Sequence, residues 1–228
     1  LYTLINSKKF NQAFVFAKKL EKNDQDGFES NIILGIHNFK NNKIELAKKY
    51  FLKAKAKNFN TILDNYLINS LYNWSDLNGK SIEESISDLK KLDERFSNLK
   101  KIQNAFLYSY FGHNDAEKFF NELTSAQKTD FSRYNYFYAK YLYSRGKVKE
   151  AKEILNSSLK KYPRNLLLNQ YELDLENSDN NFSFDFKNKS HIIAEILYIV
   201  ANAFSSQSIY SVSDFYLNLS KYLNKDFH

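Results

Sequence analysis

The feature that most constrains this chain is a pattern that recurs about every 34 residues. Each copy begins its second half with a small residue, and in the clearest copies a large apolar residue follows four positions later. Ala13 and Ala47 are 34 residues apart, Ala116 and Ala151 are 35 apart, and a looser copy lies near Ser85 between these pairs. Self-similarity at this period is typical of stacked helical repeats. The pattern therefore predicts an array of similar units over most of the 228 residues.

The segment 139–163 indicates what one unit contains. Two amphipathic stretches meet at Gly146, and Pro163, the only proline of the chain, follows the second stretch. Glycine adopts the left-handed conformation that ends a helix at no steric cost, and proline cannot continue a helix. Each unit is therefore predicted to be a pair of antiparallel helices, which must stack on its neighbours to bury its apolar faces.

The spacing within the units resembles that of the tetratricopeptide repeat. The unit 132–165 carries that family's small, apolar and proline positions at Ala139, Ala151, Leu155, Ser158 and Pro163. The unit that begins at Phe28 matches with Leu34, Gly35, Ala47, Phe51 and Ala54, and the unit that begins at Ala194 matches with Val200, Ala201, Ser213, Leu217 and Ser220. The chain departs from the family at Asn31 and Asn135, where tryptophan is preferred, and at Phe59 and Lys225, which replace the proline. The order of elements also resembles a group of alphaproteobacterial repeat proteins without an assigned activity.

The resemblance implies an all-α fold, an α-solenoid of stacked antiparallel helix pairs that winds into a right-handed superhelix. It covers nearly the whole chain, so we expect one domain over 1–228. The units are expected at about 1–26, 27–60, 61–96, 97–131, 132–165 and 194–228, with an irregular segment at 166–193.

In the family, the first helix of each unit lines a concave groove that holds the partner. The groove positions carried over onto this chain are Arg133, Tyr136, Lys140 and Tyr143 in one unit, Ile32, Ile36, Phe39 and Lys40 in another, and Tyr198 and Asn202 in the last. This set of side chains favours an extended or helical peptide with apolar anchors and some acidic character. The alternative is that the tyrosines pack against neighbouring helices of the same chain.

The segment 176–190 interrupts the pattern with a cluster of Asn, Asp and Ser residues and three phenylalanines, Phe182, Phe184 and Phe186. Exposed aromatic clusters are costly unless they have a function. We favour the interpretation that the rings fold back over helix faces. The alternative is a docking edge or a built-in peptide in the groove.

No signature of catalysis occurs in the sequence. The four histidines are scattered, cysteine is absent, and the five glycines form no phosphate-binding motif. The segment GHND at 112–115 brings acid and base types together, but at a helix turn where Asn and Asp serve as caps. We therefore expect no enzyme activity, no metal and no cofactor.

The net charge of +7 admits an acidic partner or a nucleic acid. Lysine supplies most of the positive charge, and the sequence is also rich in Asn, Ile, Tyr and Phe. We therefore attribute the charge to the overall composition of the chain rather than to a nucleic-acid partner. The lysine-rich stretch 48–58 is interpreted as a solvated helix face. The longest apolar stretch, 192–204, contains Glu195 and is too short for a membrane span. A soluble chain of the cytoplasm or the periplasm is expected.

Three functional hypotheses follow. The first is a scaffold that binds a protein or peptide partner without catalysis. The second is a recruiting or regulatory arm of a larger enzyme or envelope-assembly protein, since the chain begins within a helix pair and further repeats are expected upstream. RNA binding ranks last because few basic residues fall at groove positions.

Overall fold

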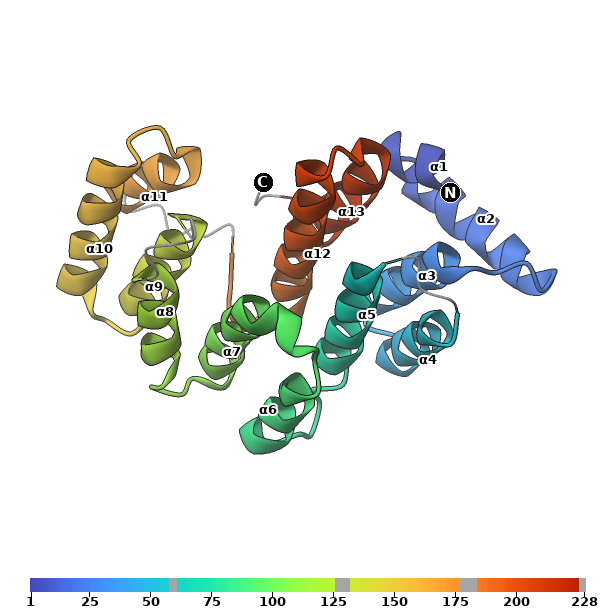
Figure 1. Ribbon diagram of the computed structural model, residues 1–228, viewed down its shortest axis with the longest axis horizontal. Coiled ribbons are helices and arrows are strands. Elements are labelled where there is room, and N and C mark those ends of the chain that lie inside the picture. The colour runs from blue at the N-terminus through green and yellow to red at the C-terminus, as the bar shows by residue number, and fades with distance from the viewer. Residues whose placement is uncertain (58–60, 126–131, 177–183, 226–228) are drawn as a thin grey trace. The chain divides into compact units, whose positions relative to one another are not determined.

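The computed structural model describes residues 1–57, 61–125, 132–176 and 184–225, and every regular element within them is a helix (Figure 1). The prediction of an all-α fold is confirmed. Contacts group the described residues into two compact units. One takes in Leu1–Asp93 and Ser183–His228, and the other Glu94–Phe182, as far as these ranges are described.

The first unit contains eight helices in its described residues, six from the start of the chain and two from its end. They are α1 (Tyr2–Asn6), α2 (Phe10–Lys22), α3 (Phe28–Lys40), α4 (Ile44–Lys55), α5 (Ile62–Ser75), α6 (Ile82–Lys90), α12 (Lys189–Ser206) and α13 (Tyr210–Leu223). The second unit contains a short 3₁₀ helix, η1 (Glu94–Phe96), followed by α7 (Ser97–Phe111), α8 (Ala116–Thr124), α9 (Ser132–Ser144), α10 (Val148–Lys161) and α11 (Leu166–Glu176).

Helices that follow one another pack as pairs, and the turn inside each pair contains a residue in the left-handed conformation. These residues are Lys8, Asn42, Gly79, Gly112, Gly146 and Ser208. The predicted role of Gly146 is confirmed by its φ of 76°. Lys8 and Asn42 are 34 residues apart, as are Gly112 and Gly146, so the period of the sequence reappears as a period of turn geometry. The helix pair is therefore the repeating unit of the structure.

The recurring small residues let the second helix of a pair approach the first. Ala13, Ala47, Ala116 and Ala151 are all fully buried. The approach is close between α3 and α4, where a Cβ added to Gly35 would lie only 2.3 Å from the ring of Phe51. Phe51 is itself fully buried. The glycine of α3 is thus required by the aromatic ring of α4.

The last helix pair does not follow the order of the chain. The α12–α13 pair packs against α1, α3 and α5 of the first unit (Figure 1). The expectation that all pairs stack in sequence order therefore fails for this pair. The physical reason lies in α12, which is apolar on more sides than one partner helix can cover: its buried side chains include Ile192, Ile193, Ile196, Leu197, Val200 and Phe204. Contact with both α13 and α5 removes these side chains from water.

The second unit has an aromatic core. The ring of Phe106 in α7 lies 5.0 Å from that of Phe137 in α9, and the rings of Phe120 and Tyr138 stack at 5.7 Å. Helix α11 packs on α9 and α10. This helix lies inside the segment that was predicted to be irregular.

Candidate protein-interaction surfaces

The first helices of the pairs in the first unit are covered by the chain itself. The ring of Phe215 in α13 lies 4.6 Å from that of Tyr2 in α1. The hydroxyl of Tyr216 donates a hydrogen bond of 3.3 Å to Asp64 of α5, and burial raises the pKa of this carboxyl. The neighbouring Tyr222 packs its ring 4.7 Å from that of Phe10. The α12–α13 pair therefore covers one side of α1, α3 and α5.

Three of the four predicted groove residues of α3 are buried, and the fourth contacts α13. Ile32, Ile36 and Phe39 are buried. Lys40 is exposed, but its ammonium donates a hydrogen bond to the backbone carbonyl of Tyr222 and lies 3.7 Å from the centre of that ring. Lys40 therefore helps to hold the chain's own C-terminal helix pair.

The predicted groove residues of α9 are partly buried against α11. Tyr136 and Lys140 are 3% and 5% exposed, the ring of Tyr136 lies 5.0 Å from that of Tyr171, and the ammonium of Lys140 lies 6.0 Å from the centre of the same Tyr171 ring. Of the two alternatives for the tyrosines, the structure shows for Tyr136 that it packs against another helix of the same chain. Arg133 and Tyr143 are only half-buried, and the guanidinium of Arg133 lies 5.8 Å from the ring centre of Phe137.

The remaining predicted groove residues are on α12. Tyr198 is half-buried and Asn202 is exposed. The residues on α3 and α12 belong to the first unit, and those on α9 belong to the second. The structure therefore does not gather the predicted set into one open groove within either unit.

Two of the three phenylalanines of the interrupting segment are buried. Phe184 and Phe186 are 0% and 6% exposed, and their rings meet at 5.3 Å. The interpretation that the rings fold back is confirmed for these two. Phe182 lies outside the described residues.

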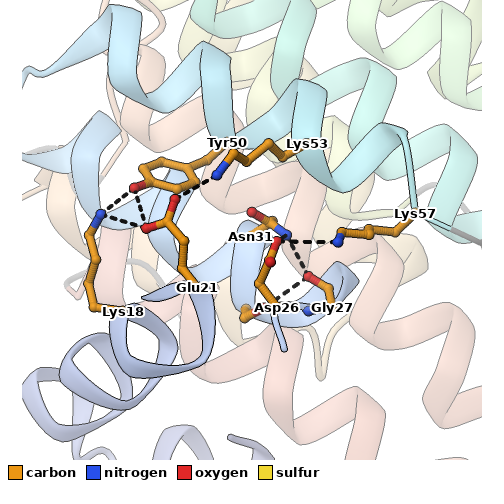
Figure 2. A network of polar contacts seen from close by, with 9 residues as sticks. Lys18, Glu21, Asp26, Gly27, Asn31, Tyr50, Lys53 and Lys57 are labelled. Atoms are coloured by element: carbon orange, nitrogen blue, oxygen red, sulfur yellow. Dashed lines mark hydrogen bonds and ion pairs between the residues drawn. The ribbon is translucent and has the colours of Figure 1, made fainter. Parts of the chain in front are cut away.

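A network of charged groups joins α2 to α4 (Figure 2). The carboxylate of Glu21 accepts hydrogen bonds from Lys18 at 2.9 Å, from the Tyr50 hydroxyl at 2.9 Å and from Lys53 at 2.6 Å. Burial raises the pKa of Glu21, but the three hydrogen bonds outweigh it and lower that pKa to about 2. Glu21 is therefore ionised at neutral pH and binds α2 to α4.

A second group lies beside this network and fixes the start of α3 (Figure 2). The amide of Asn31 donates to the Asp26 carboxylate and to the backbone carbonyl of Gly27, both at 2.7 Å. Lys57 lies 3.4 Å from the same carboxylate. Asn31 occupies the position where the repeat family prefers tryptophan, and here it ties the helix to the preceding loop.

The network can be tested through its pH dependence. Because the pKa of Glu21 is lowered on folding, the ionised carboxylate stabilises the fold above pH 4.5, and this stabilisation is lost as the pH falls toward 2. Replacing Glu21 by glutamine should cost about 1–2 kcal/mol at pH 7, an amount reduced by partial exposure of the network. The difference from wild type should shrink strongly at pH 3 in urea unfolding followed by circular dichroism.

The matched control is Glu45→Gln, since Glu45 is 86% exposed and its ion pair with Lys48 measures 3.4 Å. This change should alter the free energy of unfolding by less than about 0.5 kcal/mol at either pH. An equal loss for both variants, or a loss for Glu21→Gln that is as large at pH 3 as at pH 7, would contradict the assigned network.

An open recess of about 600 Å³ lies along α4 and α5. One face of α4 supplies most of its wall and α5 adds one ring: the lining residues are Glu45, Lys48, Lys49, Leu52, Lys53, Ala56 and Tyr72. We call this the α4 recess. Among these lining residues, Leu52 is 48% exposed.

Two of the three lysines of the α4 recess form ion pairs within the described residues, and the third does not. Lys48 lies 2.5 Å from Asp76, and Lys53 lies 2.6 Å from Glu21. The hydrogen bonds to these carboxylates raise the pKa of both lysines. Lys49 is exposed and forms no ion pair with any described residue. The recess thus combines an accessible leucine with one cation that is available to a ligand.

Sequence reasoning placed the lysines of α4 on a solvated face and missed Leu52 and Tyr72. A signal was present, since the buried stripe of α4 consists of Ala47, Tyr50, Phe51 and Ala54. Leu46 and Leu52 fall outside that stripe and are 45% and 48% exposed. Leucines beyond the stripe required for packing indicate an accessible apolar surface.

A second, smaller recess lies on the exposed side of α2. It measures about 320 Å³ and is lined by Asn11, Gln12, Val15, Phe16 and Lys19. We call it the α2 recess. Val15 is 71% exposed and Phe16 is 41% exposed.

The residues that the structure describes include no group of three or more His, Cys, Asp or Glu side chains placed to hold a metal ion. Within the same residues, every helix is either too short or too polar to cross a bilayer. Comparisons of the chain with protein-family models, with curated proteins and with solved structures found no match.

Proposed function

We propose that this chain is a non-catalytic protein-interaction scaffold and that it binds a partner segment at the α4 recess. The observation that carries the proposal is Leu52, which is 48% exposed in a recess where two of the three lysines, Lys48 and Lys53, are held in place by carboxylates at the α5 C-terminus and on α2. Preorganised side chains around an accessible apolar centre are typical of surfaces that bind other proteins.

The position of the recess also supports this choice. The first helices of the pairs are covered by α13 and α12 in the first unit and by α11 on α9 in the second. A partner that needs Ile32, Ile36 or Tyr136 would have to displace helices of the chain itself. A partner at the α4 recess meets exposed side chains and displaces none.

The same ion pairs weigh against RNA as the ligand. Lys48, Lys53 and Lys57 each contact a carboxylate. A phosphate backbone is bound by several uncommitted cations, and its affinity falls steeply with salt. The lysine-rich stretch offers few such cations, whereas one apolar anchor and one free lysine suit a peptide.

The proposal is tested by selecting binders from a library of random peptides displayed on phage. Selected peptides should lose at least about tenfold in affinity when Leu52 is replaced by glutamate, because the change removes an apolar contact and adds a charge to the recess. The matched control is Leu173→Glu on α11, since Leu173 is 50% exposed and lies in the second unit. Fluorescence anisotropy with labelled peptides gives the affinities.

Unchanged binding by Leu52→Glu would overturn the assignment of the recess. A selection that yields no peptide binder, together with tight and salt-sensitive binding of a poly(U) oligonucleotide, would overturn the scaffold function itself. Circular dichroism confirms that both variants keep their helices, which is expected because both leucines are exposed.

A further inference from the structure

The exposed side of α2 carries a second surface with a charge pattern of its own. The helix is anchored by Ala13, Phe14 and Ala17, which are buried. The opposite side holds the α2 recess, where Val15 and Phe16 are accessible to solvent. Val15 is the more exposed of the two, at 71%, and no packing role within the described residues accounts for it.

Lysines precede and follow these apolar residues in the sequence, and Lys19 lines the recess itself. Lys8, Lys9, Lys19 and Lys22 are exposed, and none of them forms an ion pair with a described residue.

The acidic groups nearby do not balance these lysines. Glu21 is committed to Lys18 and Lys53, and Asp26 is held by Asn31 and Lys57. Asp24 is the other carboxylate close in sequence to this surface. The surface is therefore apolar at its centre and positively charged at both ends of the helix.

We propose that the α2 recess binds an amphipathic helix of a partner protein, with apolar residues on one face and acidic residues beside them. The partner's apolar side chains would enter the recess at Val15 and Phe16, and its carboxylates would meet Lys19 and Lys22 at one end and Lys8 and Lys9 at the other. Charge complementarity of this kind selects the partner and accelerates its binding.

The geometry of α2 favours a helix as the occupant. Gln12 and Phe16 lie along one i to i+4 row and Asn11, Val15 and Lys19 along the next, and ridges of this kind pack into the grooves of another helix. Helices of the first unit already pack against one another in pairs, so a partner helix on α2 would continue the arrangement. An anionic membrane is the less suitable ligand, because interfacial helices present an apolar stripe over several turns. The outer side of α2 offers two apolar side chains and a hollow.

The inference is tested with a fluorescein-labelled helical peptide that carries leucines along one face and glutamates on its flanks. A twin peptide carries lysines in place of the glutamates. The acidic peptide should bind at least about tenfold more tightly than its twin, and raising the salt concentration should reduce the difference. The Leu52→Glu variant should bind the acidic peptide unchanged, which separates this surface from the α4 recess.

Two variants locate the surface. Val15→Ala combined with Phe16→Ala should weaken binding of the acidic peptide about tenfold or more, whereas Leu46→Ala on α4 should leave it unchanged. Lys19→Glu combined with Lys22→Glu should remove the preference for the acidic peptide.

Three outcomes would overturn the inference. They are equal binding of the two peptides, binding that ignores the α2 substitutions, and Phe16-dependent sedimentation with phosphatidylglycerol vesicles in place of peptide binding.

Discussion

Replacing Phe215 by alanine should destabilise the first unit by about 3–5 kcal/mol, the usual cost of removing a fully buried phenylalanine. Phe215 is 0% exposed and its ring contacts that of Tyr2. Because α13 covers α1 and α3, loosening it should expose helices at the other end of the chain. Hydrogen exchange measured by mass spectrometry should show lost protection in α1, α3 and α5, while α7 to α10 keep theirs.

The control for this experiment is Tyr210→Ala on the same helix, since Tyr210 is 62% exposed. It should change protection little. Loss of protection confined to α12 and α13 in the Phe215 variant would show that this pair does not support the first unit.

Replacing Gly35 by valine should cost about 3 kcal/mol or more in the free energy of unfolding, at the upper end of the range for overpacked cores. The first added carbon would lie 2.3 Å and 2.6 Å from two ring atoms of Phe51, which is fully buried. Urea unfolding should therefore show a large loss of stability.

A double-mutant cycle identifies the cause. Phe51→Ala should cost about 3–5 kcal/mol alone, but Gly35→Val and Phe51→Ala together should cost clearly less than the sum, because the valine fills part of the space that the ring leaves. Gly27→Val is the matched control: an added Cβ there has only a Glu29 oxygen near it, at 3.8 Å. Additive costs in the cycle would contradict the contact between Gly35 and Phe51.

Much of the fold could be predicted from the sequence because helix pairs leave a local signal. Ala47 and Phe51 lie where the second helix of a pair approaches the first, and Gly146 lies where the turn must be left-handed. In each case the interacting residues are close together in the sequence. Lys8, Asn42 and Ser208 adopt the same left-handed geometry without being glycine. Residue identity therefore conceals some of the turns that spacing reveals.

The position of the α12–α13 pair could not be predicted in the same way. Its contacts with Tyr2, Phe10 and Asp64 join residues that are far apart in the sequence. The repeat period indicates which helices form a pair. It does not specify which other helices that pair packs against, because any exposed apolar face could receive it. The groove residues were consequently assigned to an open surface, although Ile32 and Ile36 are buried.

The two recesses share one property that explains why they could not be predicted from the sequence pattern. Their apolar residues, Leu52 in one and Val15 with Phe16 in the other, stand among lysines on helices that are otherwise amphipathic. Charged surroundings make such positions look solvated. Exposure, rather than composition, distinguishes an apolar side chain that packs from one that is available to a partner.

The most direct test of the account places the photo-reactive residue benzoylphenylalanine at Tyr222 in the full chain. The ring of Tyr222 lies 4.7 Å from Phe10 and 5.4 Å from Phe14, and its hydroxyl lies 3.3 Å from His37. Irradiation should therefore cross-link α13 to peptides of α2 and α3, as identified by mass spectrometry. Cross-links to Leu166–Glu176 with none to α2 or α3 would show that the last pair follows α11 in chain order and leaves the first helices of the pairs uncovered.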